Sequence, residues 1–257
     1  MPSRSFVLAR DQISVLIAKD FKLKYNSSAL GFLWSILVPT LTSVVYYFVF
    51  GIMMRFDAPN YLLFLMSGTF LWQFFSNVVM MSGGVLMGNV GLLKKTSFNR
   101  ALLVRGTFYT ESIHFLLTVF VLLGMMAFYG LAPDFATFVP NFVVVMASLY
   151  LLSIGIGHAY AACNLHFRDL ERIVSIVLMM WMFCSPVFIP LTAYPDDYKW
   201  VLDYNPLAMI LIIWRDIFYT PGWHPSLFLP LLAISLVTFF LGRFVFLKME
   251  PSFAEMM

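Results

Sequence analysis

The feature that most constrains this chain is a long stretch without any charged residue, between Lys24 and Arg55. The stretch is mostly apolar, and roughly 20 consecutive apolar residues are enough for a helix to cross the hydrocarbon core of a membrane. The sequence therefore predicts a transmembrane helix over residues 31–53.

The residues before this span predict a helix of a different kind. Apolar side chains recur there at helical spacing, with Lys and Arg between them: Phe6, Ile13, Leu16, Ile17, Phe21 and Leu23. This pattern is typical of a basic amphipathic helix lying in a membrane interface. We expect residues 1–28 to form this interface helix on the cytoplasmic leaflet and the chain to turn into the membrane at Asn26-Ser27-Ser28. The segment does not have the pattern of a cleavable signal peptide.

The composition indicates that such crossings are repeated. Hydrophobic residues make up 61% of the chain and charged residues 11%, whereas a soluble domain carries about 25% charge. We therefore expect an all-α membrane protein in which residues 29–257 form one transmembrane domain. Its six predicted spans are 31–53, 61–84, 107–129, 138–163, 172–190 and 226–247. Cys163 and Cys184 lie inside predicted spans, so neither a disulfide framework nor a zinc site is supported.

The distribution of basic residues predicts the orientation. All but three of the 16 Lys and Arg residues lie on one side of the six spans. The exceptions are Arg55, Lys199 and Arg215, which share the other side with six aspartates. Because loops rich in Lys and Arg stay in the cytoplasm, we expect both termini to be cytoplasmic.

Two connecting segments are too long to be simple turns. Cytoplasmic segment 86–106 has four basic and no acidic residues, together with several apolar ones. It fits a short helix that offers an apolar ridge and a positive rim to a partner. It fits equally a basic loop that sets topology or touches anionic lipid.

External segment 191–223 contains Asn205-Pro206, which predicts a helix N-cap followed by proline at the first helical position. The apolar run 207–219 that follows is too short to cross a membrane. Together with residues 198–204, it predicts two short re-entrant or interfacial helices. The alternative, a seventh span, would move the basic C-terminal residues to the outside.

No catalytic constellation is evident. The ionisable residues inside predicted spans are Glu111, His114 and His158. Intramembrane charge is a functional hypothesis by default, but Glu111 and His114 share one helical face, and a hydrogen-bonded packing pair is favoured. His158 lies between small residues, Gly157 and Ala159, that permit close helix contact. The small number of charges near the midplane disfavours an ion-coupled pump.

The chain also lacks a nucleotide-binding motif. Segment 88–96 contains glycines and ends in Lys95-Thr96, but a phosphate-binding loop needs Gly directly before that Lys, and position 94 is Lys.

Aromatic residues make up 18% of the chain, and several share a helical face with hydroxyl groups. A channel lined by aromatic rings and hydroxyls, without charge, suits sugar rings. Packing or lipid contact is the alternative for each of these residues. The candidate channel-lining residues are Thr42, Ser43, Tyr46, Tyr47 and Phe50 on the first span, Trp72 and Phe75 on the second, and Ser175, Met179, Met182 and Pro186 on the fifth.

Three motifs resemble those of ABC-exporter permeases that move polysaccharides such as O-antigen, capsule and teichoic acid. They are the segment from Lys19-Asp20 to Pro39, Asn164-Leu165-His166-Phe167-Arg168-Asp169-Leu170-Glu171-Arg172, and Tyr204-Asn205-Pro206-Leu207. They occur in the family's order at the span boundaries. The resemblance covers nearly the whole chain and looks closest to the O-antigen branch.

This resemblance implies a homodimer in the bacterial inner membrane, surrounded by membrane lipids, with two separate ABC ATPase subunits. It implies a lipid-linked polysaccharide as cargo, moved from cytoplasm to periplasm, and no nucleic-acid partner. It implies no cofactor on this chain, with Mg-ATP bound by the partner, and no enzyme activity of its own. The rival interpretations are a related permease for a lipid, teichoic acid or drug, and a membrane-embedded enzyme of glycan or lipid metabolism that uses Glu111 and His114.

The resemblance also implies residue roles. The first and fifth spans line the channel, and the two external helices form a gate. We interpret Arg168 and Asp169, at the cytoplasmic end of a span, as a structural bracket near the ATPase interface, with direct substrate contact as the alternative. A coupling helix over 92–103 docks on the ATPase, although Phe98-Asn99-Arg100 replaces a frequent Phe-Pro-Arg. The coupling residues are Leu92, Leu93, Lys94, Lys95, Phe98, Arg100 and Leu103, and the gate residues are Asn205, Pro206, Trp214, Arg215 and Asp216.

Overall fold

The computed structural model describes residues 4–25, 31–56, 58–95, 98–167, 169–198, 200–218 and 224–253, and these contain helices and turns but no β-strand. The α-helices are α1 (Arg4–Tyr25), α2 (Trp34–Tyr46), α3 (Tyr61–Gly84), α4 (Val90–Lys95), α5 (Ala101–Phe128), α6 (Phe135–His166), α7 (Leu170–Phe183), α8 (Trp200–Tyr204), α9 (Pro206–Asp216) and α10 (Pro225–Met249). The short helical turns are η1 (Gly31–Leu33), η2 (Tyr47–Met53), η3 (Met87–Asn89), η4 (Leu191–Ala193), η5 (Asp196–Tyr198) and η6 (Glu250–Ser252).

Within the described residues, five helices are long and apolar enough to cross a membrane: residues 34–53, α3, α5, α6 and α10. The prediction of an all-α membrane protein is confirmed in this form. The helix predicted over 172–190 is shorter than expected, because α7 ends at Phe183 and the chain then turns through Pro186 to Pro190. Proline lacks the backbone N–H that would continue a helix. The turn predicted at residues 26–28 lies outside the described residues.

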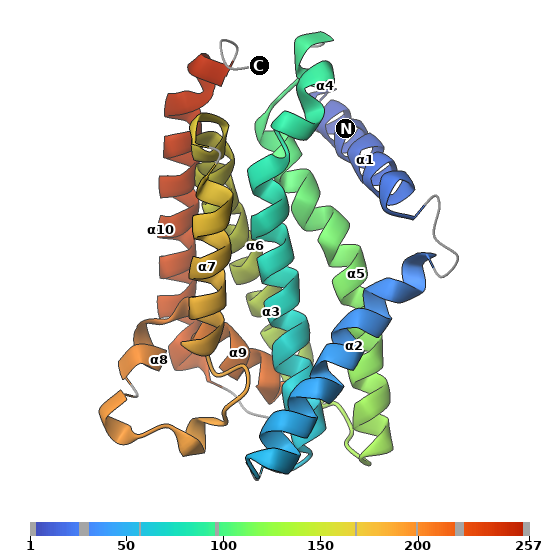
Figure 1. The fold of residues 1–257 in the computed structure, drawn as a ribbon, viewed down its shortest axis with the longest axis vertical. Helices are drawn as coiled ribbons and strands as arrows, with labels where there is room; N and C mark the ends of the chain where they lie inside the picture. The colour runs from blue at the N-terminus through green and yellow to red at the C-terminus, as the bar shows by residue number, and fades with distance from the viewer. Residues whose placement is uncertain are drawn as a thin grey trace.

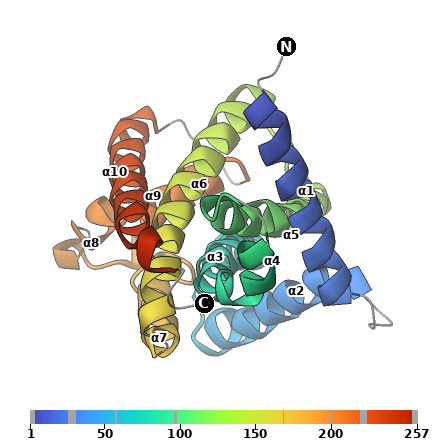
Figure 2. The same ribbon diagram turned by 90° about the horizontal axis from the view of Figure 1, so that it is seen from above.

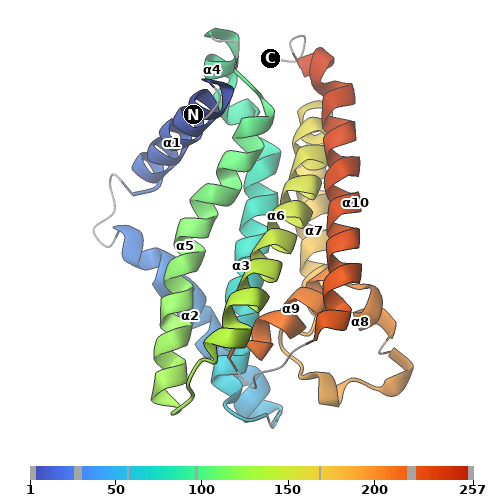
Figure 3. The ribbon, with the colours of Figure 1, turned by 180° about the vertical axis from the view of Figure 1, so that it is seen from behind.

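The helices form a bundle with different elements at its two ends (Figure 1). Helix α1, helix α4 and the end of α10 lie at one end, and α8 and α9 lie at the other, as the view from behind also shows (Figure 3). Seen along the bundle, α2 and α10 lie on opposite flanks (Figure 2). Within the apolar windows of these helices, 78% of residues are buried in α3, against 11% for residues 34–53 and 17% for α10. Helix α3 is therefore the centre of the fold.

Glycines allow α6 and α10 to pack most closely. A Cβ atom added at Gly242 on α10 would lie 1.8 Å from the carbonyl oxygen of Gly155 on α6. The obstacle is backbone, which cannot rotate away as a side chain can. Gly157, next to His158, also lies in a close helix contact, as predicted, since a Cβ there would lie 2.7 Å from Ser82 Oγ on α3.

The segment predicted as one coupling helix over 92–103 is divided, so that prediction is wrong. Helix α4 ends at Lys95, the chain is non-helical at Phe98 and Asn99, and α5 begins at Ala101. The Asn99 side-chain oxygen accepts a hydrogen bond from the Ala101 N–H (3.1 Å). Asparagine satisfies free N–H groups at helix starts in this way, so Asn99 takes part in starting α5.

The close contact between α6 and α10 predicts that Gly242→Ala destabilises the protein. The added methyl must push two backbones apart, and overpacking of this kind costs about 1–3 kcal/mol or more. Thermal unfolding in detergent, followed by tryptophan fluorescence, measures the loss. Gly124→Ala is the matched control, since a Cβ at Gly124 on α5 meets nothing within 4 Å. Equal melting temperatures for the two variants would contradict this packing.

Candidate functional site

The chain between α7 and α9 contains non-helical backbone that needs hydrogen-bond partners, and Arg215 of α9 supplies them. Its guanidinium donates to the carbonyl oxygens of Pro186 (2.5 Å) and Val187 (2.9 Å), and more weakly to that of Phe64 on α3 (3.4 Å). It also lies 3.5 Å above the centre of the Phe64 ring. Arg215 is only 8% exposed. A buried cation of this kind supplies hydrogen-bond donors to carbonyl groups of the non-helical segment. It also gains a desolvated cation–π contact.

Gly68 of α3 provides the space for this arginine. A Cβ there would lie 2.6 Å from Arg215 Nη2 and 2.8 Å from the Val187 carbonyl oxygen. The absence of a side chain on one turn of α3 thus lets the guanidinium reach the carbonyl groups.

Asn205 joins the start of α9 to the end of α7. Its side-chain oxygen accepts hydrogen bonds from the N–H groups of Leu207 (3.0 Å) and Ala208 (3.4 Å), which confirms the predicted N-cap. The same oxygen accepts from Trp181 Nε1 (2.9 Å), and the amide nitrogen donates to the Cys184 carbonyl (3.1 Å). Pro206 follows at the first helical turn, as predicted.

Two further hydrogen bonds tie this region to α3. Trp214 donates from Nε1 to the Ser67 carbonyl oxygen (3.0 Å), and Tyr61 donates from its hydroxyl to the Phe188 carbonyl oxygen (2.7 Å). We call Asn205, Trp214 and Arg215 the α9 anchor, since each side chain fixes α9 to a neighbouring segment. The sequence singled out these three residues but not Tyr61, whose hydroxyl has no local pattern to mark it.

Asp216, the last predicted gate residue, closes the other end of α9. Its carboxylate is largely buried and lies 2.5 Å from Nδ1 of the half-exposed His224, just before α10. Burial raises the pKa of the Asp216 carboxyl, and the hydrogen bond and charge of His224 oppose that rise. The pair links the end of α9 to the start of α10.

The predicted channel-lining residues fall into two groups. Trp72 and Phe75 of α3 are buried in the core, and Ser43 is buried against Thr69 with 2.6 Å between the hydroxyl oxygens. Five of them are half-buried: Thr42, Tyr46, Tyr47, Phe50 and Met182. Ser175 and Met179 are exposed on α7, and Pro186 is buried.

The half-buried aromatic residues gather around Phe188. The Phe50 ring is stacked on Phe188 (4.9 Å between centroids, 13° between planes), and the Tyr46 ring meets Phe188 edge-on (4.7 Å). Tyr47 contacts Tyr61 instead (6.2 Å). Phe188 therefore connects the C-terminal end of the first span to the non-helical segment after α7, a link that sequence spacing could not reveal.

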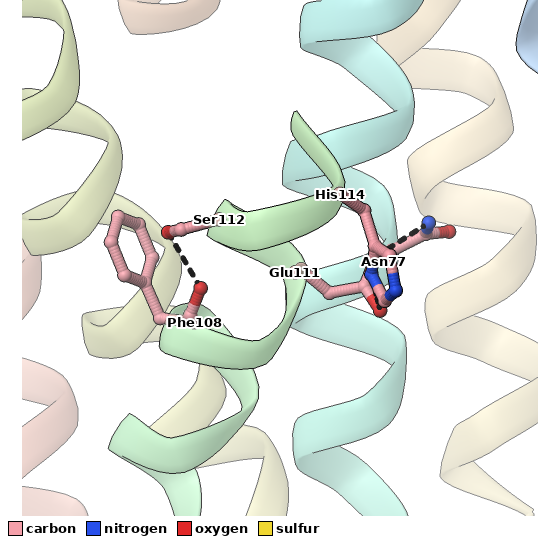
Figure 4. A network of polar contacts seen from close by, with 5 residues as sticks. All are labelled: Asn77, Phe108, Glu111, Ser112 and His114. Carbon is pink, nitrogen blue, oxygen red and sulfur yellow. Dashed lines mark hydrogen bonds and ion pairs between the residues drawn. The ribbon is translucent and has the colours of Figure 1, made fainter. Parts of the chain in front are cut away.

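A polar cluster lies between α3 and α5, with Glu111 and His114 buried and Asn77 exposed (Figure 4). Asn77 Nδ2 donates to Glu111 Oε2 (3.1 Å), and His114 Nδ1 lies 3.5 Å from Glu111 Oε1. These residues border a cavity of about 40 Å³, and the Phe21 ring of α1 stacks on His114 (5.1 Å). Glu111 and His114 thus lie against each other, as predicted, at ion-pair distance. Asn77 was not predicted, although Gln73 and Asn77 form an i,i+4 polar pair in an apolar helix.

The predicted coupling residues lie at the end of the bundle that holds α1 and α4. Lys94 is exposed, Leu93 and Phe98 are half-buried, and Leu103 is buried. Leu92 and Lys95 belong to α4, and Arg168 lies outside the described residues. Next to it, Asp169 is exposed at the start of α7.

At this end of the molecule, two hydrogen bonds join elements that are distant in the sequence. Arg100 Nη1 donates to the Glu250 carbonyl oxygen (2.8 Å), and Lys19 Nζ of α1 donates to Asn89 Oδ1 (2.6 Å). Among the described residues no group of three or more His, Cys, Asp or Glu is placed to hold a metal ion.

Comparison with known proteins gives a consistent result. The model of the family described as "ABC-2 type transporter" matches residues 11–219. The O-antigen export system permease protein RfbA of Klebsiella pneumoniae is 32% identical over 247 residues, which cover 96% of this chain and 95% of that protein. The RfbA protein of Myxococcus xanthus is 31% identical over 245 residues, 93% of each chain. The polysialic acid transport protein KpsM of Escherichia coli is 25% identical over 263 residues, 98% of each chain.

The α9 anchor predicts a large effect of Arg215→Met. The methionine fills part of the volume but leaves the carbonyls of Pro186 and Val187 without their donor, at about 1–3 kcal/mol each. We expect a clearly lower melting temperature in detergent. Arg55→Met is the control, because Arg55 is an exposed arginine. A melting temperature of Arg215→Met that matches the control would show that the anchor is dispensable.

Proposed function

The chain belongs to the ABC-2 type transporter family, and on this premise we propose that it is the membrane subunit of an ATP-driven exporter of lipid-linked polysaccharide. The observation that carries the proposal is its similarity, over nearly the full length, to proteins named as O-antigen export permeases. In this proposal the cargo passes from cytoplasm to periplasm through a channel between two copies of the chain in the inner membrane.

The proposed topology has six crossings and two cytoplasmic termini. Helix α7 has 14 residues and spans roughly 21 Å at 1.5 Å per residue, short of a hydrocarbon core of about 30 Å. The non-helical segment 184–190 completes this crossing. Helices α8 and α9 are then re-entrant on the periplasmic side, where they form the gate. The distribution of Lys and Arg supports this orientation.

The energy comes from two copies of a separate ABC ATPase that bind Mg-ATP. This chain carries no phosphate-binding loop, and relatives are named as permeases rather than ATPases. We propose that α4 and the residues that follow it contact the ATPase. The exposed Lys94 supports this, and so does the absence of acidic residues from segment 86–106.

The channel wall is proposed to consist of the outward faces of α2 and α7. Helix α2 carries no charged residue, and on α7 the charged residues Glu171 and Arg172 lie in the first turn. Beyond that turn the exposed residues of α7 include Ser175, Met179 and Phe183. Such a surface offers stacking and hydroxyl contacts to sugar rings. Trp72, Phe75 and Ser43 support the wall from behind, because they are buried within one copy of the chain.

The topology predicts the labelling of single cysteines in a Cys163→Ser, Cys184→Ser background. Asp203→Cys in α8 should react with a membrane-impermeant maleimide from the periplasm. Lys248→Cys at the end of α10 should react only after the inner membrane is opened. Both native side chains are exposed in the structure, so access depends on the membrane side. Labelling of position 248 from the periplasm would instead support a seventh crossing.

The proposed function predicts that an ABC ATPase co-purifies with the chain and that Lys94→Glu with Lys95→Glu weakens this association. Like charges placed against each other in an interface cost several kcal/mol, so we expect at least about tenfold weaker binding and less ATP hydrolysis. Lys248→Glu, an exposed reversal near the same end of the bundle, is the control. If the unchanged chain purifies without any ATPase, the exporter proposal fails.

A further inference from the structure

Residues 250–253 follow the last predicted span and received no role from the sequence. They comprise the short helix η6 (Glu250–Ser252) and Phe253, and we call these four residues the post-α10 turn. Arg100, between α4 and α5, donates a hydrogen bond from Nη1 to the Glu250 carbonyl oxygen (2.8 Å). Its guanidinium also lies over the Phe253 ring, 5.9 Å from the centroid. One arginine thus makes two contacts to a segment about 150 residues away in the sequence.

The post-α10 turn is itself firmly held. Phe253 is 0% exposed and meets Phe246 of α10 edge-on, with 5.3 Å between ring centroids. Ser252 is hydrogen-bonded through its hydroxyl to His166 Nε2 at the end of α6 (3.1 Å) and donates to the Met249 carbonyl oxygen (2.7 Å). The turn therefore joins α6 and α10 to the residue before α5.

These contacts distinguish two basic residues, Lys94 and Arg100, that the sequence alone assigns to the same role. Lys94 is exposed on α4, whereas Arg100 is half-buried and points toward the post-α10 turn. An arginine that already donates to a backbone carbonyl and lies over a buried ring is suited to fixing a segment. It is less suited to presenting a free charge to a partner.

We propose that the post-α10 turn positions the segment between α4 and α5 by holding Arg100, and so sets the orientation in which α4 meets the ATPase. The proposal rests on the function proposed above, because it assigns the held segment to ATPase docking. In it, Phe253 and Ser252 are positioning residues that act through Arg100 and His166 without touching the partner.

The test combines a local probe with a binding measurement. A spin label at Lys94→Cys, in the Cys163→Ser, Cys184→Ser background, reports the mobility of α4 in the purified full-length chain. Phe253→Ala should raise that mobility, because Arg100 loses the ring beneath it. ATPase binding should weaken roughly two- to thirtyfold, the range in which residues remote from a site alter coupling. Phe244→Ala is the matched control, since Phe244 lies on α10 and is exposed.

Two milder variants keep the test decisive if Phe253→Ala folds poorly. Ser252→Ala removes the bond to His166, and Arg100→Lys keeps the charge but loses the planar fork that reaches both Glu250 and Phe253. Each should mobilise the label and weaken binding with little change in melting temperature. Unchanged mobility and unchanged binding in both variants would overturn the proposal.

The two proposals fail in different ways. If the variants mobilise the label at position 94 but the unchanged chain binds no ATPase, the post-α10 turn does hold the segment and the proposed function is wrong. If the unchanged chain binds the ATPase while none of the variants alters the label or the binding, the function stands and the positioning role is wrong.

Discussion

The structure depends on one requirement, that backbone polar groups at membrane depth must find partners within the protein. The helices meet it internally, but the chain between α7 and α9 does not, because Pro186 and Pro190 interrupt it. Arg215 and Asn205 supply the missing donors and acceptors. Arg215, a charged residue in an otherwise apolar helix, therefore makes the non-helical segment possible.

That arrangement divides the molecule into well-packed and sparsely packed parts. Helices α3, α6 and α10 share close contacts at glycines, and Gly68 extends the same principle to the arginine of α9. Helix α7, by contrast, buries only Leu178 and presents most of its apolar side chains outward. Apolar side chains on an outward face have few contacts within the chain. Exchanging their contacts with lipid or with another protein surface therefore costs little free energy. The fixed core and the outward faces of α2 and α7 thus suit a transporter in which one surface must separate from another.

Sequence reasoning found the features that depend on local pattern. Uncharged runs identified the long helices, and Asn205-Pro206 identified the start of α9, because both signals are contained in consecutive residues. It could not tell which face of a helix is buried, so Trp72 and Phe75 were assigned to a channel although they lie in the core. The prediction of a single helix over 92–103 was wrong because α4 ends at Lys95 and α5 begins at Ala101, whose N–H donates to the Asn99 side chain. Phe188 carried no local signal, since its importance comes from residues distant in the sequence. Asn77 carried one, its i,i+4 spacing from Gln73, but that spacing does not reveal its partner Glu111.

Charge counting has the same limit, and the basic end of the bundle shows why. The positive-inside rule treats all Lys and Arg residues as equal contributions to topology. In the folded protein their roles differ. Lys19 of α1 donates a hydrogen bond to Asn89, Arg100 donates one to the Glu250 carbonyl oxygen, and Lys94 remains exposed. A charge that fixes topology during insertion is thus free to acquire a second role in the folded state. Which role it acquires depends on whether a carbonyl group or an aromatic ring lies within reach, and that is a property of the tertiary structure.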